Sequence, residues 1–411
     1  MLCMKNTPSN RQLKKLWEYV EFQNGYAFKS NEYQHTGFFI MRIKNVQDWY
    51  ISLDDPQYIA LAREKEFEKF ILNENDILMS LTGNIWRVWL IQKQHLPALL
   101  NQRVARLKID LRYIVAEYLF YFLRRSEFQK VLMERASWAA QKNISVKDIA
   151  QIQIPIPPLE EQKKIVAYLD ELNATISKLK SEYQSQLAML DEMRNSSLDL
   201  AFWGSRERAY NLNNWKWVKL GEVCEKITDG THQTPTYFDN WFVFLSSKNV
   251  TSGKIDWDNI KYIDEKQHIE MQKRIAPKKW DILLAKNWTT GIAAIVDRDI
   301  IFDIYVSLAL LRPQKNIIDN KYLLYFVNSP SAKQQFNKRI KWVGVPNLHL
   351  KEIKDVELPL PDLETQSQIV AHLDQVHQQI TMLKTQVNSQ IEHCDELWQS
   401  SLEKVLTQGV E

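Results

Sequence analysis

The amino-acid sequence predicts an α+β fold in which two globular domains are joined by two long antiparallel coiled-coil helices. The first observation behind this prediction is an internal repeat. IPIPPLEEQKKIVAYLD at 154–170 and LPLPDLETQSQIVAHLD at 358–374 agree at ten of the sixteen positions that follow their first residue. The two segments lie 204 residues apart, and KNV recurs at the same spacing, at 44–46 and 248–250. The second observation is a heptad pattern after each segment, so the chain is a pseudo-two-fold tandem repeat.

Each repeat divides into a mixed domain and a long helix. The domains are predicted at 1–155 and 209–359, and the helices at 156–208 and 360–411. Short runs rich in β-branched and aromatic residues, such as FFIMRIKNV and WFVFLSSKNV, alternate with turn residues and predict strands. Apolar positions at helical spacing follow in AEYLFYFLRRSEF and NKYLLYFVN. The Pro-rich stretches IPIPP and LPLPD then predict an extended connection to each long helix.

The long helices carry an apolar seam at alternating steps of four and three residues, with one added step of four near the middle. Its predicted members are Ile165, Leu169, Leu172, Ile176 and Leu179, followed by Tyr183, Leu187, Leu190 and Met193, and in the second repeat Ile369, Leu373, Val376, Ile380 and Leu383, followed by Val387, Ile391, Cys394 and Leu397. One short seam cannot bury itself. The two helices of one chain can pair with each other, or the seam can form a homodimer.

Composition excludes several classes of protein. The 411 residues include 25% charged residues and have a net charge of +3, so the charge neither requires nor excludes nucleic acid. No apolar run is long enough to span a membrane, no secretory signal precedes the first domain, and three scattered cysteines suit a reducing compartment, so we expect a cytoplasmic protein. The sequence contains neither a phosphate-binding GxxxxGK[ST] loop nor an HExxH zinc motif.

The repeated PLEEQ and DLETQ segments, the heptad helices and KLGEVCEKITDGTHQTP resemble the specificity subunit of Type I restriction-modification enzymes. The resemblance covers essentially the whole chain. It implies that each globular domain is a target-recognition domain for one half of a bipartite double-stranded DNA sequence, with the helices as a spacer. It also implies a non-catalytic chain without cofactor or metal. S-adenosylmethionine would be held by two methyltransferase subunits, and ATP and Mg²⁺ by partner subunits that include the restriction/translocase subunits. A coiled-coil scaffold with two protein-binding heads is the alternative.

Polar and basic residues in predicted loops are the candidates for DNA contact, because amides, hydroxyls and cations can reach base edges or phosphates. TDGTHQTPTY at 228–237 combines such side chains with Gly and Pro. RIKN and SSKN end matching strands, so their Lys and Asn occupy equivalent places, and each of these Asn residues is equally a routine turn former. The full set is Lys44, Asn45, Arg87, Arg103, Arg106, Thr231, His232, Gln233, Thr234, Ser247, Lys248, Asn249, Lys286, Asn287, Thr289 and Thr290.

Tryptophan and glycine are unusually distributed, with 14 Trp and only 10 Gly. Several Trp lie opposite Gly in the other repeat, at an offset of 204 or 205: Trp17 and Gly221, Trp49 and Gly253, Trp241 and Gly37, Trp86 and Gly291, and Trp288 and Gly83. Trp280 lies in KKWD, where the family tends towards Gly. Glycine and tryptophan do not interchange in turns that need positive φ. We therefore predict that these six Trp are Gly in the native protein, encoded by UGA codons that its translation system reads as glycine.

Overall fold

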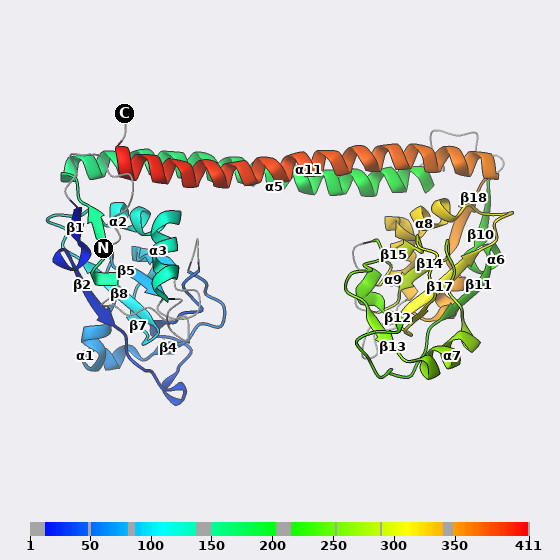
Figure 1. The fold of residues 1–411 in the computed structure, drawn as a ribbon, viewed down its shortest axis with the longest axis horizontal. Coiled ribbons are helices and arrows are strands. Elements are labelled where there is room, and N and C mark those ends of the chain that lie inside the picture. The colour runs from blue at the N-terminus through cyan, green and yellow to red at the C-terminus, as the bar shows by residue number, and fades with distance from the viewer. Residues whose placement is uncertain are drawn as a thin grey trace. The chain divides into compact units, whose positions relative to one another are not determined.

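The computed structural model describes residues 13–47, 51–80, 87–136, 149–202, 215–250, 253–287, 290–339 and 348–409. The chain forms two compact units. Unit 1 comprises Met1–Tyr183 and Ser389–Glu411, and unit 2 comprises Gln184–Asn388. The compact units therefore run through the long helices instead of ending where each helix begins (Figure 1).

The N-terminal domain consists of short strands followed by helices. Its strands are β1 (Leu13–Lys15), β2 (Val20–Asn24), β3 (Phe38–Met41), β4 (Tyr58–Ile59), β5 (Ile77–Ser80), β6 (Val88–Leu90), β7 (Ala98–Leu100), β8 (Val104–Ile109) and β9 (Gln153–Pro155). Its α-helices are α1 (Glu64–Phe67), α2 (Ala116–Leu123) and α3 (Ser126–Ala136), and the long helix α5 (Leu159–Phe202) follows β9.

The C-terminal domain repeats this order. Its strands are β10 (Lys216–Lys219), β11 (Cys224–Asp229), β12 (Phe242–Leu245), β13 (Lys261–Ile263), β14 (Ile282–Ala285), β15 (Ala293–Ile295), β16 (Phe302–Ile304), β17 (Leu308–Pro313) and β18 (Glu357–Leu360). Its helices are α6 (Leu220–Val223), the 3-10 helix η8 (Ser247–Val250), α7 (Glu265–Arg274), α8 (Asn320–Asn328), α9 (Pro330–Arg339), α10 (Leu350–Lys354) and the long α11 (Leu363–Gln408).

Both domains have the same strand connectivity, which confirms the predicted repeat. The order β2-β8-β5-β6 corresponds to β11-β17-β14-β15, and β4-β3-β7 corresponds to β13-β12-β16. In the smaller sheet β3 pairs parallel with β7, as β12 does with β16. The first strand of each domain pairs antiparallel with the last, β1 with β9 and β10 with β18.

The central strands are buried on both faces, which explains their continuous apolar runs. Ile77 and Met79 of β5 pack in the core that includes α2, whereas Leu78 packs with β3 and β7. In the C-terminal domain, Ile282 and Leu284 of β14 likewise face α8, and Leu283 faces the smaller sheet. Each domain is thus a four-stranded sheet between a helical layer and a smaller sheet.

Each long helix is attached to its domain by a buried glutamine. Gln162 Nε2 donates to the carbonyl oxygens of Tyr113 and Pro157, at 2.8 Å each, and Gln162 Oε1 accepts from the Val115 amide at 2.8 Å. Gln366 makes the corresponding three bonds in unit 2. Both side chains are fully buried. The glutamine of the repeated PLEEQ and DLETQ segments therefore satisfies backbone groups that water cannot reach.

Within each unit the seam of one long helix is covered by the other long helix of the same chain. Ile165, Leu169 and Ile176 of α5 pack with Cys394 and Trp398 of α11 in unit 1. In unit 2, Leu198 and Phe202 of α5 pack with Ile369 and Leu373 of α11. The start of each helix meets the end of the other, so the pairing is antiparallel. Leu172 and Leu179 are partly buried against the unit 1 core, Val376 is half-buried and Ile380 is buried.

The seam departs from the prediction at three residues. Leu383 is 44% exposed, Met193 is 57% exposed and Leu397 is 51% exposed. Beyond Cys394 the buried positions are Trp398, Leu402 and Leu406, in steps of four, together with Val405. Steps of four turn the buried face gradually around the helix. Leu397, three residues after Cys394, therefore points to solvent. Across the described ranges of the chain, no helix is both long and apolar enough to span a membrane.

Candidate nucleic-acid interface

The turn after the first strand of the smaller sheet is built around an asparagine in both domains. Asn249 Oδ1 accepts from the Ser246 amide at 2.9 Å, and its Nδ2 donates to the carbonyl oxygens of Asp256 and Asn259. Asn45 accepts from the Arg42 amide at 3.2 Å and donates to Ser52 O at 2.9 Å. Both asparagines are buried: Asn45 is 0% exposed and Asn249 is 6% exposed. Their amide groups hold the turn, so we leave them out of the DNA-contact set.

Two of the basic candidates, Arg106 and Lys286, are buried in ion pairs. Arg106 is 4% exposed, lies 2.8 Å from Asp76 and donates to Ile71 O at 2.9 Å. Arg312 makes the equivalent contacts with Asp281 and Ala276 O in the C-terminal domain. The second buried candidate, Lys286, is 3% exposed and donates to Asp229 Oδ2 at 2.7 Å. Since these cations are enclosed with their carboxylates, they stabilise the sheets and present no charge to a DNA backbone.

The remaining candidates differ in exposure and in what they contact. In the N-terminal domain Lys44 and Arg103 are exposed, and Arg87 Nη1 lies 3.5 Å from Val46 O. In the C-terminal domain, His232, Gln233, Thr234 and Lys248 are exposed, Thr231 and Thr290 are half-buried, and Ser247 is buried. His232 lies 3.4 Å from Asp229. Thr289 lies outside the described residues.

The structure brings several C-terminal candidates to one cavity of about 390 Å³. Ser247, Lys248, Asn249 and Asn287 line it, together with Tyr237, Phe244, Ser246, Asn259, Lys261, Tyr305 and Ser307. Thr234 Oγ1 lies 3.4 Å from Tyr305 Oη, and Thr231 forms a β-bridge with Tyr305. The loops after β11, β12, β14 and β16 therefore meet at one edge of the domain, which we call the loop edge.

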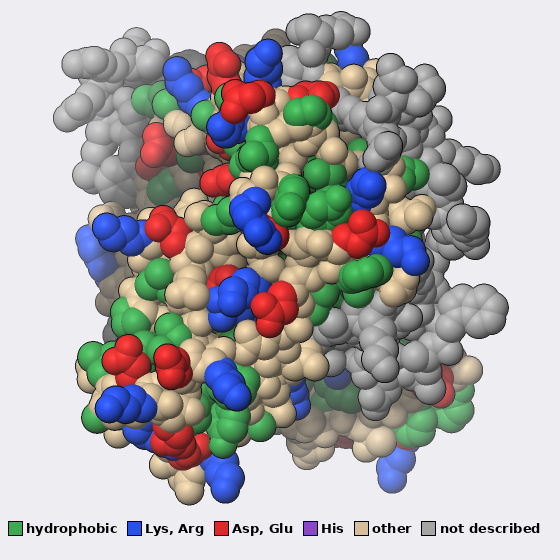
Figure 2. Space-filling model, turned by 90° about the vertical axis from the view of Figure 1, so that its left-hand side faces the viewer, with side chains coloured by type: hydrophobic (Ala, Val, Ile, Leu, Met, Phe, Trp, Pro, Cys, Tyr) green, Lys and Arg blue, Asp and Glu red, His purple; other side chains and the backbone are tan. Residues whose placement is uncertain are grey.

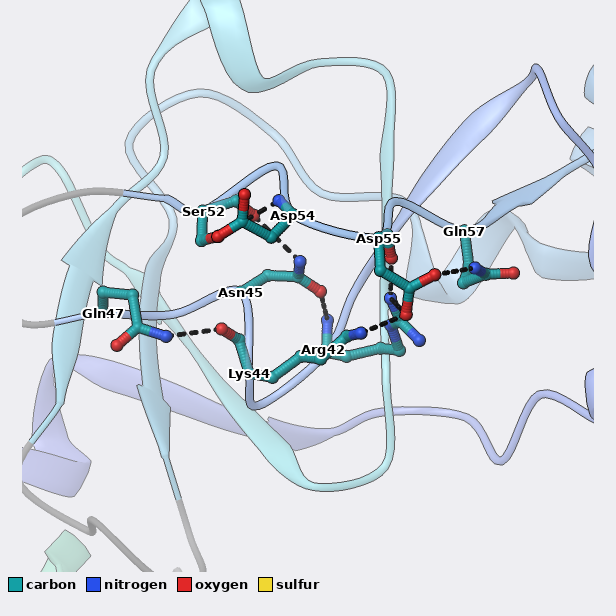
Figure 3. Close-up of polar contacts among 8 residues, drawn as sticks. All are labelled: Arg42, Lys44, Asn45, Gln47, Ser52, Asp54, Asp55 and Gln57. Carbon is teal, nitrogen blue, oxygen red and sulfur yellow. Dashed lines mark hydrogen bonds and ion pairs between the residues drawn. The ribbon is translucent and has the colours of Figure 1, made fainter. Parts of the chain in front are cut away.

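The N-terminal loop edge has the same backbone frame and different side chains. Asp55 accepts hydrogen bonds from Lys44 and from Gln57, and its backbone carbonyl accepts from Arg42 (Figure 3). Lys44 holds the pKa of the Asp55 carboxyl below its usual range. Arg42, Asp55 and Gln57 align with Ser246, Asn259 and Lys261 of the other domain, at the offset of 204. Among the described residues, a polar network thus occupies N-terminal positions that correspond to part of the C-terminal cavity lining.

Sequence reasoning missed the aromatic side chains of the C-terminal loop edge. Tyr305 lies 61 residues after Phe244 in the chain, and Phe244 is part of an ordinary apolar strand. The parallel pairing of β12 with β16 brings Phe244 and Tyr305 to a ring-centroid distance of 6.1 Å. The signal in the sequence was that Tyr237 is the last residue of the polar loop predicted at 228–237.

Charge is mixed on the part of the surface visible in Figure 2. Lys and Arg side chains alternate there with Asp and Glu, and apolar side chains lie between them. This agrees with a net charge of only +3. The visible face therefore shows no continuous basic patch, and the specific loop contacts remain the candidates for a nucleic-acid interface. In the described portion of the chain, no group of three His, Cys, Asp or Glu side chains is arranged to hold a metal ion.

A duplicated α+β domain, with a polar loop edge and a long helix in each copy, is the architecture of a tandem-repeat protein with two similar heads. The model of the Type I restriction modification DNA specificity domain matches residues 8–187 and 213–393, one match in each repeat. The chain belongs to this family, and its function is DNA sequence specificity in a Type I restriction-modification system.

Known relatives and solved structures agree with this assignment. The chain is 26% identical over 404 residues to the Type I restriction enzyme EcoBI specificity subunit of Escherichia coli, covering 93% of this chain and 82% of that protein. It is 26% identical to the MjaVIII specificity subunit of Methanocaldococcus jannaschii, covering 79% and 77% respectively.

Two solved structures share the fold. A chain from a study of complex assembly and conformational transition in the type I R-M system matches with a TM-score of 0.74 at 20% identity, covering 99% of this chain and 100% of that one. The HsdS subunit of Thermoanaerobacter tengcongensis matches with a TM-score of 0.56 at 21% identity, covering 99% of each.

Proposed function

We propose that the N-terminal domain reads one half of a bipartite double-stranded DNA target and the C-terminal domain reads the other half. The observation that carries this proposal is the pair of loop edges. In both, a buried asparagine holds the turn after the first strand of the smaller sheet, whereas Arg42, Asp55 and Gln57 in one are replaced by Ser246, Asn259 and Lys261 in the other. Two copies of one frame with different side chains suit two different half-sites.

We further propose that the long helices set the spacing between half-sites and dock two methyltransferase subunits. The chain itself has no catalytic role in this proposal and binds no cofactor. S-adenosylmethionine belongs to the methyltransferase subunits, and ATP and Mg²⁺ belong to partner subunits in complexes that also contain restriction/translocase subunits. The assembled complex acts in the cytoplasm.

Methylation sequencing of cells that express this chain with its methyltransferase subunits tests the proposal. We expect one bipartite methylated motif. Arg103→Ala, in the N-terminal domain, should weaken or relax one half-site, and Gln233→Ala, in the C-terminal domain, should affect only the other, since both side chains are exposed at their loop edges. If no complex that contains this chain retains duplex DNA at low salt, the proposal is wrong, and the alternative of two protein-binding heads is favoured.

A further inference from the structure

The cavity at the C-terminal loop edge is lined by aromatic and basic side chains. Contacts to base edges in a stacked duplex do not require such a recess. Phe244, 2% exposed, and the buried Ser247 contribute to its lining. Tyr237, 42% exposed, and the exposed side chains of Lys248 and Lys261 also belong to the lining. Its volume of about 390 Å³ is in the range of roughly 300–1,000 Å³ typical of small-molecule sites. The cavity therefore combines an aromatic interior with a basic rim.

The aromatic side chains form walls to which a planar ring can stack. The Phe244 ring lies 6.1 Å from that of Tyr237 and 6.1 Å from that of Tyr305, at interplanar angles of 55° and 59°. Lys261 Nζ lies 3.8 Å from the centre of the Tyr237 ring. Stacking on Tyr or Phe is sequence-tolerant, because every base has a π-face.

One polar atom in the cavity lacks the partner that its burial requires. Asn287 Oδ1 is buried and accepts no hydrogen bond from the described part of the chain. The nearby polar groups are already engaged: Asn249 holds its turn, and Ser307 Oγ accepts from the Ser247 amide at 3.0 Å. A buried acceptor without a donor is unfavourable, so a ligand with an N–H group would pair with this atom once the Asn287 side chain turns towards the cavity.

The N-terminal domain carries different side chains at the described positions that correspond to the cavity lining. The residues there that align with Ser246 and Asn259 are Arg42 and Asp55, which are bound to each other, and Asp55 also binds Lys44 (Figure 3). Asn101 and Ile40 take the places of Tyr305 and Phe244. At these described positions the N-terminal domain thus has charged, polar and aliphatic side chains, whereas the C-terminal domain has aromatic rings beside an open space.

We propose that this cavity accepts one extrahelical nucleobase of the half-site read by the C-terminal domain. The base stacks against the aromatic walls, the Asn287 side chain turns to accept from one of its N–H groups, and Lys248 and Lys261 face its phosphates. A base within the duplex stack cannot enter a recess of this kind, so the base must leave the stack. The inference rests on the proposed function, because it requires that the C-terminal loop edge contacts DNA.

The test uses the complex of this chain with its methyltransferase subunits and a duplex of the target found by methylation sequencing. At each position of the C-terminal half-site, the opposite nucleotide is replaced by an abasic one, which leaves the read base intact but unpaired. Extrusion of an already unpaired base avoids the unpairing cost. We expect binding to tighten about tenfold or more at one position besides the base that the complex methylates.

Variants of the cavity identify where that base goes. Tyr305→Ala and Asn287→Ala should abolish the tightening at that position, whereas Tyr305→Phe, which keeps the ring, should retain it. Tightening at the methylated base should persist in every variant, since that base enters a partner subunit. Thermal unfolding midpoints equal to that of the unchanged chain establish that the variants are folded.

Two results separate the inference from the proposed function. If the complex binds its target but no abasic substitution tightens binding outside the methylated base, the cavity takes no extruded base and the inference fails alone. A tightening that survives both Tyr305→Ala and Asn287→Ala would also overturn it. If the complex binds no duplex at all, the proposed function fails together with the inference.

Discussion

Trp241 and Trp280 occupy backbone positions that disfavour any side chain. Their φ angles are 111° and 78°. Gly37, which aligns with Trp241, has a φ of 133°, and a Cβ there would lie 2.1 Å from Ile59 O. Asn75, which aligns with Trp280 at the offset of 205, has a φ of 71°. The two repeats therefore share turns with positive φ, and the indoles of Trp241 and Trp280 are 62% and 44% exposed.

We predict that Trp241→Gly and Trp280→Gly each stabilise the protein by about 1 kcal/mol or more, because strained backbone of this kind costs of the order of 1–3 kcal/mol. Chemical denaturation measures the change. Trp257→Gly is the matched control and should destabilise, since Trp257 is buried and its Nε1 donates to Asp297 at 2.9 Å. Loss of stability in the first two variants, or UGG codons at these positions in the gene, would contradict the glycine assignment.

Trp17 fits the same prediction less directly. It is 52% exposed, and a Cβ on the aligned Gly221 would lie 3.3 Å from Lys354 Cβ and 3.4 Å from Lys354 O, whereas the backbone of Gly221 has no positive φ. Trp49, Trp86 and Trp288 lie outside the described residues. The gene sequence tests all six positions together.

Local patterns predicted turn residues well and ion pairs poorly. Asn45 and Asn249 hold turns, the alternative that their position at a strand end had left open. Arg106 and Lys286 appeared available to DNA in the sequence, because their carboxylate partners Asp76 and Asp229 lie 30 and 57 residues away. Only the pairing of strands distant in the sequence brings such groups together, so burial of a charge was not predictable from a single segment.

At the scale of secondary-structure elements, the junction between each domain and its long helix depends on one glutamine. We predict that Gln366→Ala destabilises unit 2 by about 2–4 kcal/mol, because two carbonyls and one amide lose their partner in a buried site. Gln378→Ala, exposed on the same helix, should change stability by less than about 0.5 kcal/mol. Urea unfolding of both variants provides the comparison, and equal effects would show that the junction is not specifically held by Gln366.

His377 makes the helix pairing of unit 2 sensitive to acid. It is buried, its Nε2 lies 3.1 Å from Ser197 Oγ, and its ring packs edge-on against Tyr325. Burial, and then the charge of Arg194, lower the pKa of His377 to about 4, while Asp374 opposes the shift. Protonation below the unfolded-state pKa of about 6.5 therefore favours the unfolded state.

We predict that neutral His377 makes its full contribution to the free energy of unfolding of unit 2 above about pH 6.5. As the pH falls to about 4.5, that free energy should decrease by roughly 2 kcal/mol. Hydrogen exchange of α8 and the first half of α11 measures this loss. His377→Gln should remove that part of the pH dependence, whereas His372→Gln, on the exposed side of α11, should retain it. An identical pH profile for all three chains would rule out His377 as the titrating group.

The two long helices were predictable as elements because their heptad pattern is local and repeated. The course of the seam beyond Cys394 was not, since it depends on which face the partner helix covers. Leu397 fits the heptad count and is exposed, whereas Trp398 is buried against Tyr121 of the N-terminal domain. Contact with the domain, in addition to helix pairing, selects the buried face at this end of α11.

At the scale of the whole molecule, each compact unit combines the domain of one repeat with a helix end from the other. In unit 1, Glu403 of α11 accepts from Arg125 Nε at 2.8 Å and from the Glu127 amide at 3.1 Å at the start of α3. In unit 2, Asp199 of α5 accepts from Ser331 Oγ at 2.6 Å and from the Ser331 amide at 3.2 Å at the start of α9. The two carboxylates align at the offset of 204, and each binds the first turn of a helix, where negative charge is favourable.

The partners of the carboxylates differ between the units, and this difference sets the size of the expected effects. Arg125 is 1% exposed, so Glu403→Ala leaves a buried guanidinium with only part of its compensation and should destabilise unit 1 by about 3 kcal/mol. Asp199→Ala removes a helix cap and should destabilise unit 2 by about 1 kcal/mol. Hydrogen exchange resolved by peptide distinguishes the two: Glu403→Ala should deprotect α2 and the described part of α3 while α8 and α9 keep their protection, and Asp199→Ala should do the reverse. Deprotection of α8 and α9 by Glu403→Ala would show that the C-terminal end of α11 does not belong energetically to unit 1, contrary to the division seen in the structure.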